Sequence, residues 1–460
     1  MVSATLARYF GVSLLLIGGA MAIPFVLALS LKDPAAGNYA FGLAVTLFAG
    51  AGFMVLGAGS RREVDFRSAI FLVIIWWSAA PLFAALPFWL GGWSPIDGYF
   101  ESVSAVTTTG ATLERGDLRT SPPALAWRAI LQWIGGLVSL AAAAAIFIRP
   151  QFVGADNVEP TFSRGEDGSY TFAFKSALRV FAPVYGALTF IAFAVFALGG
   201  APTFDSFVLA LSCIASGGIV PHPDGLSAYS DAAAVAYFPF MVLSGASFIL
   251  IVRAFSRKRT KAADVETSVY LLLSLLLALL FLLFEGDTVF ASLFNAASLF
   301  STNGIVIGAK PDLIFALVTV IIGGCAISTA GGLKILRWIV VIRRTQMEVR
   351  RLIMPSAVFG PRTTRNELGV WMHFLVFTMG LAVLTTALTA GGHSIEAAAA
   401  GAVGAVANAG PVMALTPEGH EGYHIFEDDW IRLLLAAAMI GGRLEGVAAL
   451  MLIKGAFWRT

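Results

Sequence analysis

The sequence predicts an all-α integral membrane protein with ten transmembrane helices and four shorter segments that enter and leave the bilayer on the same face. Its 460 residues are 58% hydrophobic and only 13% charged, with a mean hydropathy of +0.82. This composition is too apolar for an ordinary soluble domain. Ten apolar runs are long enough to cross a bilayer, whereas four others are about half as long and end in glycine.

Apolar runs of about 20 residues define the ten predicted spans. They cover residues 9–31, 39–58, 67–90, 125–148, 176–199, 232–254, 266–284, 312–345, 367–390 and 430–455. The first run is longer than the core of a signal peptide, so we expect it to be retained. The run 312–345 is too long for one regular span, and its glycines from Gly323 to Gly332 predict a break in the helix.

The distribution of charge predicts the orientation. An even number of spans places both termini on one side, and 23 of the 30 Lys and Arg residues fall on that side. Short loops rich in Lys and Arg remain in the cytoplasm, so we expect both termini to be cytoplasmic. Many acidic residues, including Glu101 and Asp205, fall on or near the opposite face. They would attract cations to an outer mouth, although a solvated acidic loop surface would give the same pattern.

The four half-length segments repeat one pattern. They are SPIDGYFESVSAVTTTGAT, TFDSFVLALSCIASGGIVP, DTVFASLFNAASLFSTNGIV and HSIEAAAAGAVGAVANAGPV. Aligned on Gly110, Gly217, Gly304 and Gly410, they carry Phe100, Phe207, Phe294 and Ala400 ten positions earlier. This similarity predicts a repeated unit of span, short helix, loop and span. Two N-terminal helices (1–60) would precede repeats at 61–150, 151–262, 263–350 and 351–460.

A helix of about three turns covers only half of a bilayer, so the loop after it must be buried in protein or line water. We expect a pseudo-fourfold arrangement around one central pore, as in potassium channels, with backbone carbonyls replacing the hydration shell of an alkali cation. One such loop alone would equally fit a turn at a helix end; the agreement of four favours the pore. The expected ion-binding residues are Thr108, Thr109, Gly110, Ala215, Ser216, Gly217, Thr302, Asn303, Gly304, Asn408, Ala409 and Gly410.

The chain resembles the TrkH type of potassium uptake protein in the Trk/Ktr/HKT superfamily. The resemblance extends over nearly the whole chain and is most specific in SAVTTTGAT (104–112), LQWIGGL (131–137), CAISTAGGLK (325–334) and GGRLE (441–445). It implies uptake of K⁺ across the bacterial inner membrane, with K⁺ as substrate at the filter residues and no organic cofactor. Gln132 and Trp133 are expected to pack beneath the first loop.

The resemblance also implies a gate, because relatives carry a similar Gly-rich loop that obstructs the pore below the filter and a matching arginine near it. Here these residues are Gly323, Gly324, Ser328, Thr329, Ala330, Gly331, Gly332 and Arg443. The residues alone leave two alternatives open. Small residues also suit close helix packing, and an arginine within a span also suits a structural ion pair, for example with Glu445.

Partners follow from the resemblance as well. It implies a homodimer that binds a cytosolic nucleotide-binding subunit of the TrkA type, and the basic segments 253–261 and 343–365 could contact that subunit or anionic membrane lipid. No nucleic-acid partner is expected. The alternative function is a secondary symporter that couples K⁺ or Na⁺ entry to H⁺ or Na⁺. An enzyme is not expected, because the sequence has no Walker or GxSxG motif and no transition-metal ligand spacing.

Overall fold

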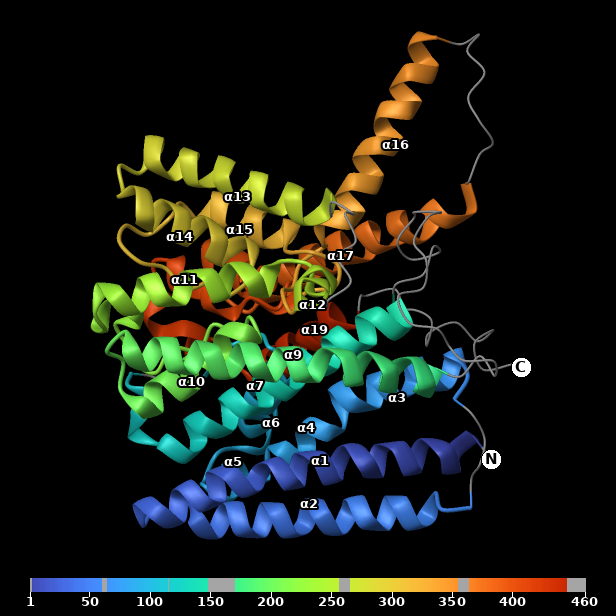
Figure 1. Ribbon diagram of the computed structural model, residues 1–460, viewed down its shortest axis with the longest axis vertical. Helices are drawn as coiled ribbons and strands as arrows, with labels where there is room; N and C mark the ends of the chain where they lie inside the picture. The colour runs from blue at the N-terminus through green and yellow to red at the C-terminus, as the bar shows by residue number, and fades with distance from the viewer. Residues whose placement is uncertain are drawn as a thin grey trace.

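The computed structural model describes residues 2–59, 64–114, 116–147, 170–255, 265–354 and 364–444. Within these ranges the chain is helical and contains no strand. Most long helices run side by side across the view in Figure 1, and only α16 (Ile335–Ile353) projects far from the body. The prediction of an all-α membrane protein is confirmed.

Seven helical stretches in the described residues are long and apolar enough to cross a membrane. The helices that form them are α1 (Val2–Leu31), α2 (Ala36–Leu56), α3 (Phe66–Ser78) with α4 (Ala80–Ala84) and α5 (Leu86–Leu90), α7 (Pro122–Ala142) with the π-turn η2 (Ala143–Phe147), α9 (Tyr170–Leu198), α13 (Val265–Phe284) and α17 (Thr364–Ala390). An eighth arises if α11 (Asp231–Gly245) and α12 (Phe248–Phe255), which are bent by 108°, count as one span.

The two remaining predicted spans do not appear as continuous helices. The run 312–345 divides into α15 (Leu313–Ile322), which has 10 residues, and α16. Gly323 and Gly332 between them have φ of 73° and 76°, a backbone region that favours glycine and ends a helix. The run 430–455 is described only as α19 (Asp429–Arg443). The expected total of ten spans is therefore not reached within the described residues.

Small residues allow α1 and α2 to pack closely as an antiparallel pair. A Cβ at Gly11 would lie 2.7 Å from the Gly50 carbonyl, and one at Gly57 would lie 2.5 Å from the Ala4 carbonyl. Such contacts are typical of helix pairs in membranes, where small residues let backbones approach. Conversely, large apolar residues cover the outer face of α13, where Leu272, Leu275 and Leu283 are exposed. This surface suits lipid rather than water.

Four helices of 12 residues alternate with the long ones, and their bounds are α6 (Pro95–Val106), α10 (Thr203–Ile214), α14 (Val289–Phe300) and α18 (Ile395–Val406). Hydroxyl N-caps begin three of them. Ser94, Thr288 and Ser394 each accept a hydrogen bond from the backbone N–H three residues later, which satisfies one exposed donor of the first turn. The fourth, α10, begins after Pro202 without a side-chain cap.

Candidate functional site

The loops after the four short helices share one backbone geometry. Directly after each helix comes a capping residue, and the next residue has a positive φ although it is not glycine. These residues are Thr108 (56°), Ser216 (53°), Thr302 (56°) and Asn408 (52°). A β-branched residue at positive φ is an outlier that costs about 1–3 kcal/mol, and such outliers cluster at functional sites.

Hydrogen bonds give the same register independently. The N–H groups of the following residues donate to the carbonyl five residues earlier, at 2.8, 2.8, 3.0 and 2.8 Å; the donors are Thr109, Gly217, Asn303 and Ala409. The equivalent glycines are therefore Gly110, Gly218, Gly304 and Gly410. This corrects the sequence alignment of the second loop, which used Gly217.

The error has a physical cause. The second loop contains two adjacent glycines, and Gly218 is the one with a positive φ, at 67°. With the corrected register, the residue ten positions before the glycine is Val208 rather than Phe207. Val208 is fully buried, as Phe100, Phe294 and Ala400 are, whereas Phe207 is only partly buried. The burial pattern on the short helices therefore agrees with the hydrogen bonds.

The four loops contact one another in a closed ring. A Cβ at Gly110 would collide with the carbonyl of Gly217, and one at Gly218 would collide with the carbonyl of Asn303. A Cβ at Gly304 would lie 3.0 Å from Pro411 in the fourth loop. The ring closes where the N–H of Gly410 donates to the carbonyl of Thr109 at 2.6 Å. Each loop thus meets the next, and the backbone approach leaves no room for side chains at these glycines.

Backbone carbonyls in this ring differ in their hydrogen bonding. The carbonyl of Thr109 accepts the N–H of Gly410, and the carbonyl of Gly217 accepts Nε2 of Gln132 at 3.1 Å. By contrast, no hydrogen bond within the described part of the chain reaches the carbonyls of the four residues with positive φ, Thr108, Ser216, Thr302 and Asn408. That row can still offer oxygen ligands, which are the ligands that alkali cations accept in filters.

Side chains in the loops bind both to a neighbouring loop and to the surrounding helices. Nδ2 of Asn408 donates to Oγ1 of Thr109 at 3.0 Å and to the carbonyl of Met439 at 2.9 Å. Nδ2 of Asn303 donates to Oγ of Ser244 at 3.1 Å. These bonds connect the third and fourth loops to α11 and α19. They also show why small polar residues suit these positions, since a buried amide needs partners.

The Gly-rich segment (residues 323–332) lies against the C-terminal ends of the short helices. Oγ1 of Thr329 donates to the carbonyl of Ile214, the last residue of α10, at 3.0 Å. The N–H of Gly331 donates to Oγ1 of Thr302 at 2.8 Å, and the N–H of Gly332 donates to the carbonyl of Ala407 at 3.0 Å. The structure therefore brings the predicted gate residues into direct contact with three of the four loop units.

Arg443 connects α19 to this segment. Its Nη2 donates to the carbonyl of Thr329 at 2.9 Å, and its Nε donates to Oγ of Ser139 at 2.8 Å. The alternative partner Glu445 lies outside the described residues. A cavity of about 330 Å³ adjoins the segment, and its wall includes Gly331, Asn408 and Arg443 together with the face of α17 around Phe377.

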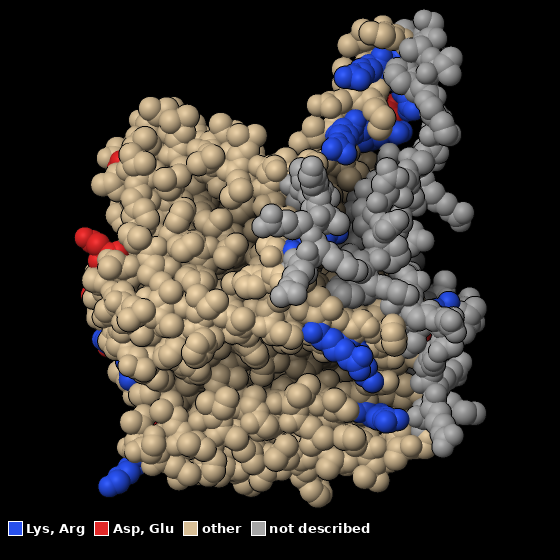
Figure 2. Space-filling view, in the orientation of Figure 1, with Lys and Arg blue, Asp and Glu red and all other residues tan. Residues whose placement is uncertain are grey.

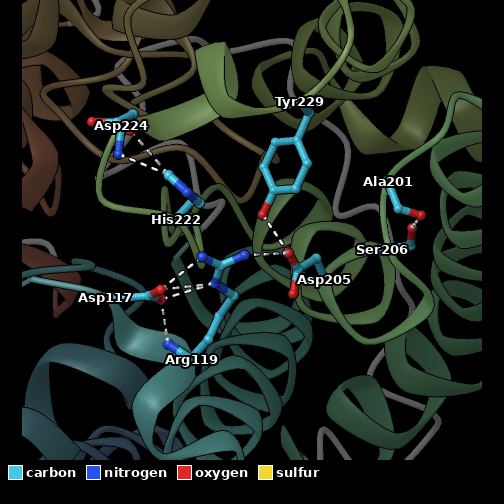
Figure 3. A network of polar contacts seen from close by, with 8 residues as sticks. All are labelled: Asp117, Arg119, Ala201, Asp205, Ser206, His222, Asp224 and Tyr229. Carbon is cyan, nitrogen blue, oxygen red and sulfur yellow. Dashed lines mark hydrogen bonds and ion pairs between the residues drawn. The ribbon is translucent and has the colours of Figure 1, made fainter.

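Residues that follow the first short helix and residues of and after the second meet in a polar network (Figure 3). Arg119, in the short helix η1 (Leu118–Thr120), pairs with Asp117 at 2.6 Å and approaches Asp205 at 3.9 Å. Tyr229 donates a hydrogen bond to Asp205 at 2.7 Å. The hydrogen bond from Arg119 lowers the pKa of Asp117 to about 2. Asp205 is only 2% exposed, so this acid is the buried member of the network and is not part of an exposed acidic surface.

Several residues at the site have roles that sequence reasoning missed. Gln132 bonds to the second loop and not to the first, and Pro411 lies against three of the four glycines. Glu101, expected near the outer surface, is 1% exposed, and Asn295 is fully buried. A carboxylate or amide in the middle of a short apolar helix is the one signal that could have identified the last two, because buried polar groups require partners.

Comparison with known proteins supports the resemblance seen in the motifs. The TrkH family model, described as a cation transport protein, matches residues 38–311. The Trk system potassium uptake protein TrkH of Halomonas elongata is 29% identical, over 98% of both chains. TrkI of the same organism, also named a Trk system potassium uptake protein, is 30% identical over 95% of this chain and 94% of its own.

A solved structure extends the likeness to the fold. The crystal structure of the potassium transporter TrkH from Vibrio parahaemolyticus is similar with a TM-score of 0.86 at 27% sequence identity, and each chain is covered completely. The predicted resemblance is confirmed, as is the expectation of a transporter instead of an enzyme. This chain is a member of the TrkH family of cation transport proteins.

Proposed function

We propose that this chain carries K⁺ into the bacterial cell across the inner membrane, through a filter of backbone oxygens from the four loops. The observation that carries the proposal is the row of four equivalent residues with positive φ, Thr108, Ser216, Thr302 and Asn408, whose carbonyls accept no hydrogen bond within the described residues. Relatives with similar sequences are named potassium uptake proteins. Potassium is the substrate, and this chain needs no organic cofactor for the task.

Electrostatics favour a cation at this position. The C-terminal ends of α6, α10, α14 and α18 all adjoin the ring of loops, and each helix end carries a partial negative charge. A dehydrated cation would gain carbonyl ligands and helix dipoles at once. The expected filter residues remain those predicted from the sequence, with Gly218 added in the second loop. The principal ligands are the carbonyl oxygens of the four residues with positive φ, Thr108, Ser216, Thr302 and Asn408.

Gating is assigned to the Gly-rich segment together with Arg443. The segment bonds to Thr302 and to the carbonyl of Ala407, so it occupies the inner side of the loops. The adjoining cavity of about 330 Å³ offers space into which the segment can move. Because Arg443 bonds to Thr329, a shift of α19 would move the gate, and a cation beside the ion path would also oppose the entry of a second cation.

Assembly and orientation follow the family resemblance. We assign four pore repeats to residues 61–150, 151–262, 263–350 and 351–460 after two N-terminal helices, both termini to the cytoplasm, and a homodimer to the working state. A TrkA-type nucleotide-binding subunit would control the gate from the cytosol. Figure 2 shows basic side chains on the projecting α16, all of which are arginine, and they form a basic surface for that subunit or for anionic lipid.

Substitution of the first glycine tests this function. Gly110→Ser places a side chain at a φ of +74° against the carbonyl of Gly217, so we expect the variant to lose its preference for K⁺ over Na⁺ in a bacterium that lacks its own potassium uptake. Gly116→Ser is the matched control, because Gly116 also has a positive φ (79°) but faces open space. Unchanged discrimination in Gly110→Ser would contradict the assigned filter.

A measurement on the purified protein separates a channel from a symporter. In liposomes, a reversal potential that follows the K⁺ gradient alone supports conduction down the electrochemical gradient. A reversal potential that moves with a pH or Na⁺ gradient would instead support coupled symport.

A further inference from the structure

Glu101 and Asn295 occupy the same position in two of the short helices. Each is the seventh residue of its 12-residue helix, α6 or α14, and they are 1% and 0% exposed. Each accepts a hydrogen bond from the backbone N–H twelve residues later. Oε1 of Glu101 accepts from Leu113 at 2.5 Å, and Oδ1 of Asn295 accepts from Ile307 at 3.0 Å. We call these two side chains the loop anchors.

The anchor in the first repeat is a buried charged network. Oε1 of Glu101 also accepts from Oγ1 of Thr112 at 2.8 Å, and Oε2 accepts from Nε of Arg128 at 2.8 Å. Arg128 in turn pairs with Glu114 at 2.5 Å. Side chains of both α6 and α7 thus hold the residues that follow Gly110. Losing one member of such a network leaves other buried groups without partners.

The anchor in the third repeat performs the same task without charge. Nδ2 of Asn295 donates to the carbonyl of Ile307 at 2.9 Å, so both backbone polar groups of that residue bind one amide. A carboxylate and an amide therefore hold equivalent loop segments in two repeats. Because two chemically different side chains accept the equivalent backbone N–H, we infer that the loop itself requires an acceptor at this position.

The other two repeats have no such anchor. The seventh residues of α10 and α18 are Leu209 and Gly401, neither of which can accept a hydrogen bond through its side chain. A Cβ at Gly401 would lie 2.7 Å from the ring of Phe426, so apolar packing occupies that place. Two of the four segments that leave the ring are consequently held by a polar side chain at this position. The segment after Gly218 is held from another position, because Oγ of Ser212 in α10 accepts the N–H of Ile219 at 2.7 Å.

We infer that Glu101 and Asn295 are positioning residues that set the K⁺ over Na⁺ selectivity of the filter, an inference that rests on the proposed function. The two ions differ in size and hydration, so discrimination depends on the spacing and rigidity of the carbonyl ring. The anchors bind the segments that follow Gly110 and Gly304. A segment released from its anchor can shift, and the glycine carbonyl at its start shifts with it.

The test compares permeability ratios of purified variants in liposomes, from reversal potentials with K⁺ on one side and Na⁺ on the other. We expect Glu101→Ala and Asn295→Ala each to lower the K⁺/Na⁺ ratio by about tenfold. Glu101→Gln should keep the ratio within about threefold, because its amide oxygen can still accept the N–H of Leu113. Leu209→Ala is the matched control: it removes a buried side chain at the equivalent position, so it should lower thermal stability and leave the ratio unchanged.

The outcomes are distinct. If folded alanine variants retain the wild-type ratio, the inference is wrong, and a reduced ratio in Leu209→Ala would assign the effect to general destabilisation instead. If neither alanine variant folds, Thr112→Val decides, because at a half-buried position it removes one donor to Glu101 and the acceptor of the Glu114 N–H, and leaves the Glu101 carboxylate in place; an unchanged ratio then overturns the inference. A wild-type protein without preference for K⁺ would contradict the proposed function itself, whatever the variants do.

Discussion

Gly217 and Gly218 stand side by side in the second loop, and only the backbone geometry separates their roles. Gly218 has a positive φ and abuts the carbonyl of Asn303. Gly217 lies where a side chain would meet the end of the Gln132 side chain, which can move aside. The sequence motif could not decide between them, because either glycine satisfies the pattern.

The two glycines therefore respond differently to substitution. We expect Gly218→Ala to lower K⁺ uptake by at least about tenfold, since it adds both backbone strain and a collision with a carbonyl. Gly217→Ala should reduce uptake by only about threefold, through displacement of Gln132. Rates of ⁸⁶Rb⁺ uptake at equal expression measure both effects. A larger loss in Gly217→Ala would restore the register first predicted from the sequence.

Asp117 gives the network around Arg119 a defined pH dependence. Arg119 lowers the pKa of this carboxyl from an ordinary 3.8 to about 2, so the folded state favours the charged form. The stabilisation is complete above the unfolded-state value and is lost as the pH falls from about 4 towards 2. We expect the melting temperatures of wild type and Arg119→Ala to differ by a constant amount between pH 5 and 8 and to converge below pH 4. A difference that changes near neutral pH would exclude this pair as its source.

Among the helices, hydrophobic periodicity and the length of apolar runs predicted where most helices lie. They did not predict where helices are interrupted or bent. The prediction of one span over 67–90 agrees with the apolar stretch Phe66–Leu90, but its helix is interrupted twice, between α3, α4 and α5, with Pro81 and Pro87 in the first turns of the two short pieces. The bend between α11 and α12 follows Gly245, where the carbonyl accepts the N–H of Cys325. That partner is far away in the sequence, so no local pattern could reveal the bend.

The short helices and their loops were predicted from glycine and length, but their anchors were not. In the sequence, Glu101 is one of several acids near predicted loops, and Asn295 is a single polar residue in an apolar helix. Neither pattern predicts a hydrogen bond to the loop. Their partners, Leu113 and Ile307, lie twelve residues away across a turn whose shape the sequence does not specify. Tertiary geometry was needed to pair them.

The Gly-rich segment makes a prediction as an element. A Cβ at Gly331 would collide with the carbonyl of Ala407, so Gly331→Ala should push the segment away from the fourth loop. We expect the unregulated K⁺ flux to rise by about fivefold, which corresponds to about 1 kcal/mol lost from the closed state. Gly186→Ala in α9 is the matched control, because a Cβ there meets nothing within 4 Å. Lower flux in Gly331→Ala at normal expression would show that the segment does not obstruct the path.

At the scale of the whole molecule, α16 is the element that departs most from the bundle (Figure 1). It carries exposed Arg343 and Arg350, together with exposed apolar residues such as Leu352 and Ile353. A basic helix that projects from a membrane protein suits a macromolecular partner better than the lipid interior.

Charge reversal on α16 tests the proposed partner. We expect Arg343→Glu with Arg350→Glu to weaken binding of the cytosolic regulatory subunit by about tenfold or more, measured by biolayer interferometry on detergent-solubilised protein. Detergent removes the bilayer, so a loss there is not an effect on lipid. Normal subunit binding combined with weaker binding to vesicles containing anionic lipid would instead assign the helix to the membrane surface.

The proposed filter is a property of the whole arrangement, since four loops from distant parts of the chain must bind one ion together. The most direct measurement is anomalous diffraction from crystals of the protein grown in Rb⁺ or Tl⁺, because both ions substitute for K⁺ and scatter strongly. Our account predicts a peak inside the ring of loops, within ligand distance of the carbonyl oxygens of Thr108, Ser216, Thr302 and Asn408. Peaks found only elsewhere, or carbonyls in this row turned away from a common centre, would contradict it.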